Sequence, residues 1–402
     1  MSRSRVSQWC VVLTLVLGAT TVAAQTPGPT RRAEIEQEQA EKAKTLHPYI
    51  ISTGERWMNK VEDITVNGGL HWHPFFDSAY HGGGFALGAG YMHHVSPYNL
   101  VDVRGNYSIR GYTRAEVEFK APRMFQRRAT LSVLGGYREA TQVAYYGAGN
   151  NTSTAAKTNY SFKRPYASAL MTLWPMRKWL MLRGGLELTQ WDQNPGEGSS
   201  PSVETVYTPE TLPGLGAKVN YFHSQGTIGF DWRDARDYSR RGGFYGITLH
   251  DYRDRDELFG FQQVDYEAIE HFPILRESWV ISLHGLAQTT LSKSGQQVPF
   301  FMQPSLGGGD DLRGYTSWLY RDRHSLILQA EWRIMVNRFM DTAVFYDAGK
   351  VAARTSDIDV ASLKHDYGFG VRFHSPLATH LRIDLAKSPQ DLILVFAGSA
   401  PF

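Results

Sequence analysis

Apolar and polar residues alternate along most of the chain after residue 64. In one segment, Leu326, Leu328 and Trp332 alternate with Gln329 and Glu331. In a β-strand such alternation sends successive side chains to opposite faces of the sheet. The runs reach the roughly 9–11 residues that a tilted membrane strand needs, whereas strands of soluble proteins average about 5–6. The pattern therefore predicts strands with one face toward lipid and the other toward a hydrated lumen.

The alternating segments predict an all-β fold: a transmembrane antiparallel β-barrel of sixteen strands. In lipid every backbone N–H and C=O must pair within the protein, and a closed barrel achieves this. An even number of strands places both ends of the barrel on the periplasmic side. Pro74 weakens the first strand because proline has no N–H. The predicted strands are 66–75, 84–95, 99–110, 112–121, 129–140, 158–174, 178–191, 216–233, 243–253, 262–273, 277–290, 324–336, 340–351, 365–375, 378–387 and 391–401.

The connections between these strands are of two kinds. Some are short and contain a proline, and others are long and polar. Short periplasmic turns and longer extracellular loops are typical of outer-membrane barrels, so this asymmetry supports the barrel and orients it. The prolines are Pro97, Pro122, Pro175, Pro273 and Pro376, and the long connections are residues 141–157, 192–215, 291–323 and 352–364.

Residues 1–24 have the pattern of a secretory signal peptide. Arg3 and Arg5 precede a short apolar run over residues 11–18, and small residues precede the expected cleavage before Gln25. The apolar run is shorter than the ~20 residues that a membrane-spanning helix requires. The sequence therefore predicts export, with the bacterial outer membrane as the destination of the barrel.

Residues 25–63 predict a periplasmic N-terminal helical segment ahead of the barrel, which spans residues 64–402. A polar stretch at 30–46 carries Glu38 and Lys42 at helical spacing. Two interpretations stay open for it: a helix at the membrane or the periplasmic mouth of the barrel, or a frayed tail. A second stretch has apolar residues at roughly helical spacing and favours a packed helix. Those residues are Ile50, Ile51, Trp57, Met58 and Val61.

Composition and charge agree with a barrel and argue against nucleic acid as a partner. The formal charge of +3 falls by two when Arg3 and Arg5 leave with the signal, so the mature chain is close to neutral. Aromatic residues make up 13% of the chain, and it contains 38 glycines. Mean hydropathy is low at −0.35, as expected where only every second strand residue meets lipid.

The sequence carries no pattern typical of an enzyme, a cofactor site or a metal site. It lacks a Gly-x-Ser-x-Gly elbow, a phosphate-binding loop and a His-Glu-x-x-His helix. The single cysteine, Cys10, lies in the predicted signal, so the mature chain has no disulfide or thiolate. His71 and His73 share a strand face, but no carboxylate or cysteine spacing completes a metal site with them. We expect a non-enzymatic protein without cofactor or metal.

Several motifs occur in order along the chain: Tyr145-Tyr146-Gly147-Ala148-Gly149-Asn150, Asp231-Trp232-Arg233-Asp234 with Gly242-Gly243, Gly307 to Tyr315, Phe345-Tyr346-Asp347-Ala348-Gly349, and a final Phe402. Because of these motifs, the sequence over about residues 84–402 resembles the BamA-type barrel superfamily, the bacterial surface antigens, to which TamA and two-partner secretion transporters belong. Leu312 stands where that superfamily usually has valine.

The resemblance implies a site in which the long sixth extracellular loop is anchored inside the barrel. Arg313 on that loop would bind Asp347 on strand thirteen, which alternation turns toward the lumen. The alternative is a solvated loop arginine and an aspartate at the lumen rim. The candidate residues are Leu312, Arg313, Gly314 and Tyr315 of the loop motif, Phe345, Asp347 and Gly349 of the strand-thirteen motif, Glu331 and Asp341 of the lumen, and Phe402 as a terminal strand signal.

The resemblance also implies insertion or translocation of protein or lipid through a lateral seam between the first and last strands. Gly398 and Pro401 would weaken that seam, since glycine packs little and proline donates no hydrogen bond. Members of the superfamily normally carry periplasmic POTRA modules, which residues 25–63 are too short to form. Expected partners are therefore outer-membrane lipid and nascent outer-membrane proteins or a separate periplasmic module. The alternative function is a passive or gated channel, or a structural barrel.

Overall fold

The protein divides into two compact units, Met1–Ser52 and Thr53–Phe402. In the first unit, α1 (Arg31–Thr45) is the predicted polar helix, with Glu38 and Lys42 paired at 4.0 Å. No helix in the described part of the chain is long and apolar enough to cross a membrane. The computed structural model describes residues 31–45, 53–54, 56–57, 59–60, 71–76, 79–176, 179–275, 278–376 and 378–402. The predicted signal at 1–24 lies outside the described residues. So do four residues of the predicted second helix: Ile50, Ile51, Met58 and Val61.

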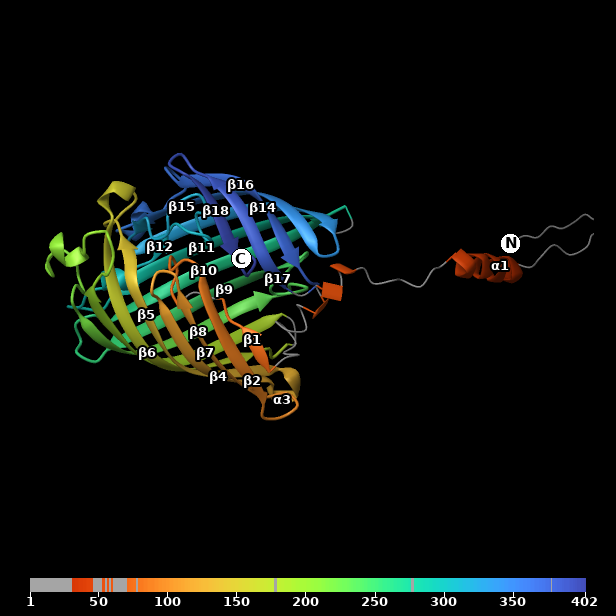
Figure 1. The fold of residues 1–402 in the computed structure, drawn as a ribbon, viewed down its shortest axis with the longest axis horizontal. Coiled ribbons are helices and arrows are strands. Elements are labelled where there is room, and N and C mark those ends of the chain that lie inside the picture. Colours follow the sequence, from red (N-terminus) through yellow and green to blue (C-terminus); the bar gives the residue numbers. More distant parts are fainter. Residues whose placement is uncertain are drawn as a thin grey trace, which may run out of the picture. The chain divides into compact units, whose positions relative to one another are not determined.

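Sixteen strands of the second unit form one antiparallel sheet that curves into a barrel (Figure 1). Each strand pairs with the next in the chain, except that β11 pairs with β14 across the β12–β13 hairpin. The strands of the sheet are β1 (Trp72–Pro74), β2 (Ala86–His94), β3 (Leu100–Ser108), β4 (Thr113–Arg123), β5 (Ala129–Tyr145), β6 (Thr158–Leu173), β7 (Leu180–Pro195), β8 (Lys218–Asp231), β9 (Gly242–Asp254), β10 (Phe261–Ile274), β11 (Trp279–Ser292), β14 (His324–Asn337), β15 (Met340–Ala352), β16 (Lys364–His374), β17 (Thr379–Lys387) and β18 (Leu392–Ala397).

The remaining elements are short and lie in the connections. The β12–β13 hairpin sits at the base of the longest of them. These elements are α3 (Met124–Arg127), η1 (Thr154–Ala156), η2 (Val203–Thr205), η3 (Phe300–Met302), η4 (Thr355–Asp357), β12 (Ser305–Leu306) and β13 (Tyr320–Arg321).

The predicted number of strands is confirmed, and the two ends of the sheet differ from the prediction. The first strand was expected at 66–75; β1 covers Trp72–Pro74, and residues 61–70 lie outside the described part. The last strand was expected at 391–401, but β18 ends at Ala397. The placement of Pro401 inside that strand is therefore wrong. Beyond Ala397 a glycine and a proline offer little packing and one N–H fewer, so the segment leaves the sheet.

The two faces of the sheet follow the alternation in the sequence. On β15, Val344 and Tyr346 are half exposed on the outer face, whereas Asp341, Phe345 and Asp347 are buried on the inner face. An apolar outside and a charged inside suit a barrel in lipid. The strands therefore bring charged side chains from distant parts of the chain together in the lumen.

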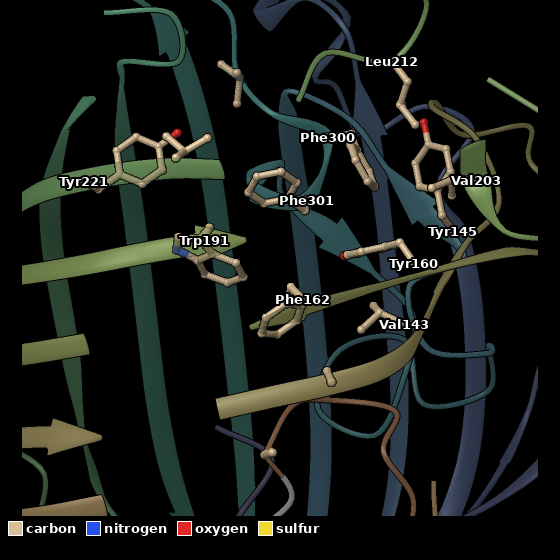
Figure 2. Packing of buried hydrophobic residues seen from close by; sticks show 14 of the residues in the cluster. Val143, Tyr145, Tyr160, Phe162, Trp191, Val203, Leu212, Tyr221, Phe300 and Phe301 are labelled. Atoms are coloured by element: carbon tan, nitrogen blue, oxygen red, sulfur yellow. The ribbon is translucent and has the colours of Figure 1, made fainter. Parts of the chain in front are cut away.

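An aromatic cluster fills the lumen at the end that carries the long loops. Tyr160, Phe162 and Trp191 reach inward from the ends of β6 and β7, and Phe300 and Phe301 descend from the connection before β12 (Figure 2). The ring centroids of Tyr160 and Phe300 lie 4.9 Å apart, and those of Phe162 and Trp191 4.8 Å apart. Aromatic pairs at these separations contribute beyond their buried area. The cluster is thus a packed core inside the barrel.

The sheet has two free edges, β1 and β18. β1 pairs only with β2, and β18 only with β17, among the strands that the structure describes. Both are short: 3 residues in β1 and 6 in β18, against 16 in β6 and β7. We call the boundary between β1 and β18 the seam.

Candidate functional site

The inserted loop, residues 307–319, joins β12 to β13 and folds back into the lumen. Gly307 and Gly308 begin it with φ of 110° and 123°, a backbone region that side chains rarely adopt. A Cβ on Gly307 would also collide with the carbonyl oxygen of Thr316. Glycine is therefore required where the chain turns inward, and the β12–β13 hairpin holds the two ends of the loop together.

Arg313 lies at the centre of the contact between the inserted loop and the barrel wall. Its Nε donates to Oδ2 of Asp347 at 2.6 Å, and its Nη2 donates to Oδ1 at 2.8 Å. This two-bonded pairing is the strongest geometry between a guanidinium and a carboxylate. The guanidinium also lies 3.5 Å from the centroid of the Phe345 ring. The structure thus places the two predicted motifs against each other, with β15 as the thirteenth strand of the sheet.

Two further carboxylates and a second arginine extend this pair into a network. Glu331 accepts from Nη1 of Arg313 at 3.1 Å and from Nη2 of Arg372 at 2.7 Å. Asp384 accepts from Nη1 of Arg313 at 3.2 Å and also from Arg372. All of these side chains are at most 2% exposed. Removing one member of such a buried network leaves charges uncompensated, at a cost of about 3–5 kcal/mol.

The wall also binds the backbone of the inserted loop. Nη2 of Arg382 donates to the carbonyl oxygen of Gly309 and to Oδ1 of Asp310, both at 2.7 Å. Nε2 of Gln329 donates to the carbonyl oxygens of Asp310 and Asp311 at 3.1 and 3.0 Å. Carbonyl oxygens buried without a partner are costly, so the hydrogen bonds from Arg382 and Gln329 fix the path of the loop backbone.

The other residues of the two motifs provide close packing. Leu312 is fully buried in a small apolar cluster with Leu306, Leu319, Tyr320 and Ile327. These contacts hold the base of the inserted loop against β14.

Two glycines permit close approach. A Cβ on Gly314 would lie 2.7 Å from Cβ of Asp366, and one on Gly349 would lie 2.7 Å from the carbonyl oxygen of Leu326. The hydroxyl of Tyr315 donates to the carbonyl oxygen of His365 at 3.1 Å. Gly314 and Tyr315 thus bring the loop against β16, and Gly349 lets β15 lie close to β14.

Asp341 and Phe402 lie apart from the Arg313 network. Asp341 accepts from Tyr238 and lies 3.2 Å from Nε2 of His374, near the short turns. Phe402 lies beyond β18, with its ring centroid 5.0 Å from that of His284. The prediction had grouped Asp341 with Asp347, because both share a strand face. Six residues along β15 separate them, so the same face does not bring them into one network.

One of the two other motifs of the sequence supports the same region. The N–H of Gly149 donates to the carbonyl oxygen of Arg321 at 2.8 Å, and the N–H of Val351 donates to Oδ1 of Asn150 at 3.3 Å. The motif at 145–150 thus ties its loop to β13 and β15. By contrast, Asp231 binds Arg233 within the turn between β8 and β9.

Charge and burial shift the pKa of two groups on the inserted loop. Burial opposes the charge of Arg313, but the carboxylates of Asp347, Glu331 and Asp384 outweigh it and raise the pKa of the guanidinium above its ordinary value. Burial and the neighbouring Asp310 raise the pKa of the Asp311 carboxyl to about 7. Arg313 is therefore a permanent cation, and Asp311 is the group of the loop that titrates near neutral pH.

Sequence reasoning missed Arg372, Arg382 and Asp384 as members of this site. Arg382 and Asp384 alternate with Leu381, Ile383 and Leu385, which indicates the polar face of a strand, but alternation gives no register between strands far apart in the chain. That alternation was the available signal. His73, considered for a metal pair, lies 2.8 Å from Asp102, and the described residues contain no group of three side chains that could hold a metal ion.

Comparison with known families and structures gives a consistent result. The family model described as the Omp85 superfamily domain matches residues 99–392. The chain is similar to BamA from Haemophilus ducreyi, solved without POTRA domains 1–3, with 17% identity and a TM-score of 0.58 over 82% of this chain and 67% of that chain. It is also similar to CdiB from Escherichia coli, with 11% identity and a TM-score of 0.52 over 81% of this chain and 60% of that chain. At these identities the likenesses show the fold alone. No curated protein sequence matches the chain.

Proposed function

The chain belongs to the Omp85 superfamily, and from this premise we propose that it inserts or translocates protein at the outer membrane through the seam. A nascent outer-membrane protein would pair with the free edges of β1 and β18 and pass sideways into the bilayer. In this proposal the N-terminal segment, residues 25–63, faces the periplasm, and a separate periplasmic module delivers the substrate.

The unpaired edges of β1 and β18, among the strands that the structure describes, are the observation that carries the proposal. Unpaired strand edges present N–H and C=O groups that another strand can bind. In a membrane those groups need a protein partner, because lipid tails offer none. The short lengths of β1 and β18 leave few hydrogen bonds to break if the two edges meet. The seam is thus the position in the barrel at which an added strand costs least.

The filled lumen argues against the alternative of a passive channel. The aromatic cluster around Phe300 and Trp191 occupies the loop end of the lumen, and the inserted loop occupies the wall beside β15. Continuous aqueous passage would require both to move. A lateral route through the seam leaves the cluster in place, so it is the less costly path for a polypeptide.

Cross-linking the seam tests the proposal. Cysteines replace Trp72 on β1 and Phe396 on β18, both exposed on the outer surface, and a short bis-maleimide joins them. The full-length protein is then placed in lipid vesicles with an eight-stranded outer-membrane protein unfolded in urea. We expect the cross-link to abolish the catalysed folding of that protein, followed by its altered mobility on unheated gels.

A second cross-link serves as the matched control. Leu385 and Leu394 are register partners on β17 and β18, so cysteines at these positions bridge strands that are already paired. This cross-link should leave the catalysed folding unchanged. If the cross-linked seam folds the substrate as fast as the control, the lateral route is wrong. Conductance of ions through the unmodified barrel would instead favour the channel.

A further inference from the structure

The two ends of the inserted loop, at Gly308 and Trp318, contact the segment that precedes β2, on the β1 side of the seam. Nε1 of Trp318 donates to the carbonyl oxygen of His81 at 3.0 Å. The indole stacks on Tyr80 with ring centroids 4.8 Å apart and planes 10° apart. A Cβ on Gly308 would collide with the His81 ring, so loop backbone and imidazole are in direct contact. The loop therefore covers residues 80–82 from inside the barrel.

The start of the inserted loop, at Gly309 and Asp310, also contacts the last two strands, on the β18 side of the seam. Arg382 on β17 binds Gly309 and Asp310 at 2.7 Å. A Cβ on Gly309 would lie 2.9 Å from Cγ1 of Val395 on β18. Consecutive residues of the loop, Gly308 and Gly309, thus touch opposite sides of a boundary that no described backbone hydrogen bond crosses.

The two attachments differ in kind. On the β18 side the loop is held by charge-assisted hydrogen bonds from Arg382 and, further along, by the network of Arg313. On the β1 side Trp318 makes a neutral hydrogen bond and ring contacts, and, among the described residues, the His81 ring contacts Gly307 and Asp310 without an arginine partner from the wall. Charge-assisted bonds are roughly twice as strong as neutral ones. Trp318 also has φ of 68°, an unfavourable conformation for a bulky residue, so this attachment carries strain.

We propose that the inserted loop is a strap that holds the seam shut at its loop end, and that it releases on the β1 side, at Trp318. The proposal rests on the proposed function, because it describes how that seam is controlled. When the seam opens, the strap stays with β14 to β18, and the hairpin of β1 and β2 moves away from it. Trp318 is the positioning residue for the closed state.

Two engineered disulfides distinguish release of the inserted loop on the β1 side from its release on the β18 side. An ideal Cβ at Gly82 lies 3.5 Å from Cβ of Ser317, within the range that a disulfide bridges, so Gly82→Cys with Ser317→Cys ties the strap to the β1 side. Gly309→Cys with Val395→Cys ties it to β18 instead. Both pairs are introduced in the full chain, whose mature part has no other cysteine.

The separation of the seam edges is the measurement, made in nanodiscs with an unfolded outer-membrane protein present. Spin labels carried by unnatural amino acids replace Tyr91 on β2 and Leu394 on β18, and pulsed electron resonance gives their distances. Without a disulfide we expect a short and a long distance. The Gly82–Ser317 disulfide should remove the long distance, and the Gly309–Val395 disulfide should leave it. Reducing agent should restore the long distance in the first case.

Every other result contradicts the proposal that the inserted loop holds the seam shut and releases at Trp318. The reverse pattern means that the loop releases from β18. An equal effect of both disulfides, or of neither, means that the loop does not control the seam. A single short distance in the protein without a disulfide instead defeats the lateral seam, and with it the proposed function, so the two failures are distinguishable.

A substitution provides a second test that needs no cross-link. Trp318→Ala removes the stack on Tyr80 and the hydrogen bond to His81, which should raise the ratio of long to short distances about two- to ten-fold. Trp179→Ala, which removes an exposed tryptophan at the short-turn end, should leave the ratio unchanged. An unchanged ratio in Trp318→Ala would show that Trp318 does not hold the seam.

Discussion

Two networks of buried charge in the lumen are built differently. The wall network joins neighbouring strands: Arg104 binds Asp102, Glu116 and Glu118 at 2.7–2.9 Å across β3 and β4. Glu116 is also paired with Arg114 at 2.7 Å and with Arg138 on β5 at 2.8 Å. The loop network around Arg313 instead joins a loop to strands that are distant in the chain. The first network reinforces contacts that the sheet already makes, whereas the second creates a contact that the sheet alone would lack.

The two networks also differ in the number of oppositely charged partners that a buried carboxylate has. Glu116 has three arginine partners, so losing one leaves it compensated. Among the described residues, Arg313 is the one cation paired with Asp347. A redundant network tolerates substitution, and a network with a single central residue does not. The position of the inserted loop therefore depends on Arg313 in a way that the sheet does not depend on Arg104.

The largest expected effect is that of Arg313→Ala. It leaves the carboxylate of Asp347 buried without a cation, so we expect a loss of about 3–5 kcal/mol in the free energy of unfolding. We also expect new cleavage by proteinase K within residues 307–319. Unfolding in urea, followed by tryptophan fluorescence in lipid vesicles, measures the first effect, and mass spectrometry of the fragments measures the second.

Arg104→Ala is the matched comparison in the wall network. Its carboxylate partner Glu116 keeps Arg114 and Arg138, so we expect a smaller loss of about 1–3 kcal/mol and no new cleavage in the inserted loop. Equal losses, or loop cleavage in both variants, would mean that the two networks do not differ in the way described above.

A smaller effect is expected from Gly314→Ala. The added methyl group would lie 2.7 Å from Cβ of Asp366 and 3.0 Å from the backbone nitrogen of Ser388, so the loop must shift away from β16. Overpacking of this kind costs about 1–3 kcal/mol. Gly184→Ala on β7 adds the same methyl group where no atom lies within 4 Å, and its stability should be unchanged. Proteolysis of the loop at increasing urea concentration compares the two variants; equal midpoints would contradict the packing described for Gly314.

Much of the barrel could be predicted from the sequence, because period-two alternation is a local property. The number of strands and the inward direction of Asp347 follow from counting alone, and the prediction that Arg313 meets Asp347 came from two recognisable motifs. The ends of the sheet were less predictable. The chain leaves the sheet after Ala397, and the position where an edge strand ends depends on the strand that lies beside it. A local sequence pattern does not specify that neighbour.

The contents of the lumen could not be predicted in the same way. Phe300 and Phe301 lie in a stretch that the sequence marks only as a long polar connection, and nothing local directs them into the barrel. Arg372 and Arg382 join the loop network through the curvature of the sheet, which brings β16 and β17 around the inserted loop. Contacts between distant segments depend on register and closure, and these are properties of the whole sheet.

The smallest expected effect is the pH dependence of the inserted loop. Asp311 belongs to the inserted loop, and its neighbours Asp310 and Asp347 raise its pKa while His284 lowers it, with burial the largest cause of its value of about 7. A carboxyl whose pKa is raised in the folded protein contributes stability below its ordinary pKa and loses it as the pH rises through about 7. The inserted loop should therefore become more accessible to proteinase K between pH 5 and pH 8. Asp311→Asn should remove that rise, whereas Asp357→Asn in an exposed loop should keep it. The same rise in the Asp311→Asn variant would show that another group sets the pH dependence of the loop.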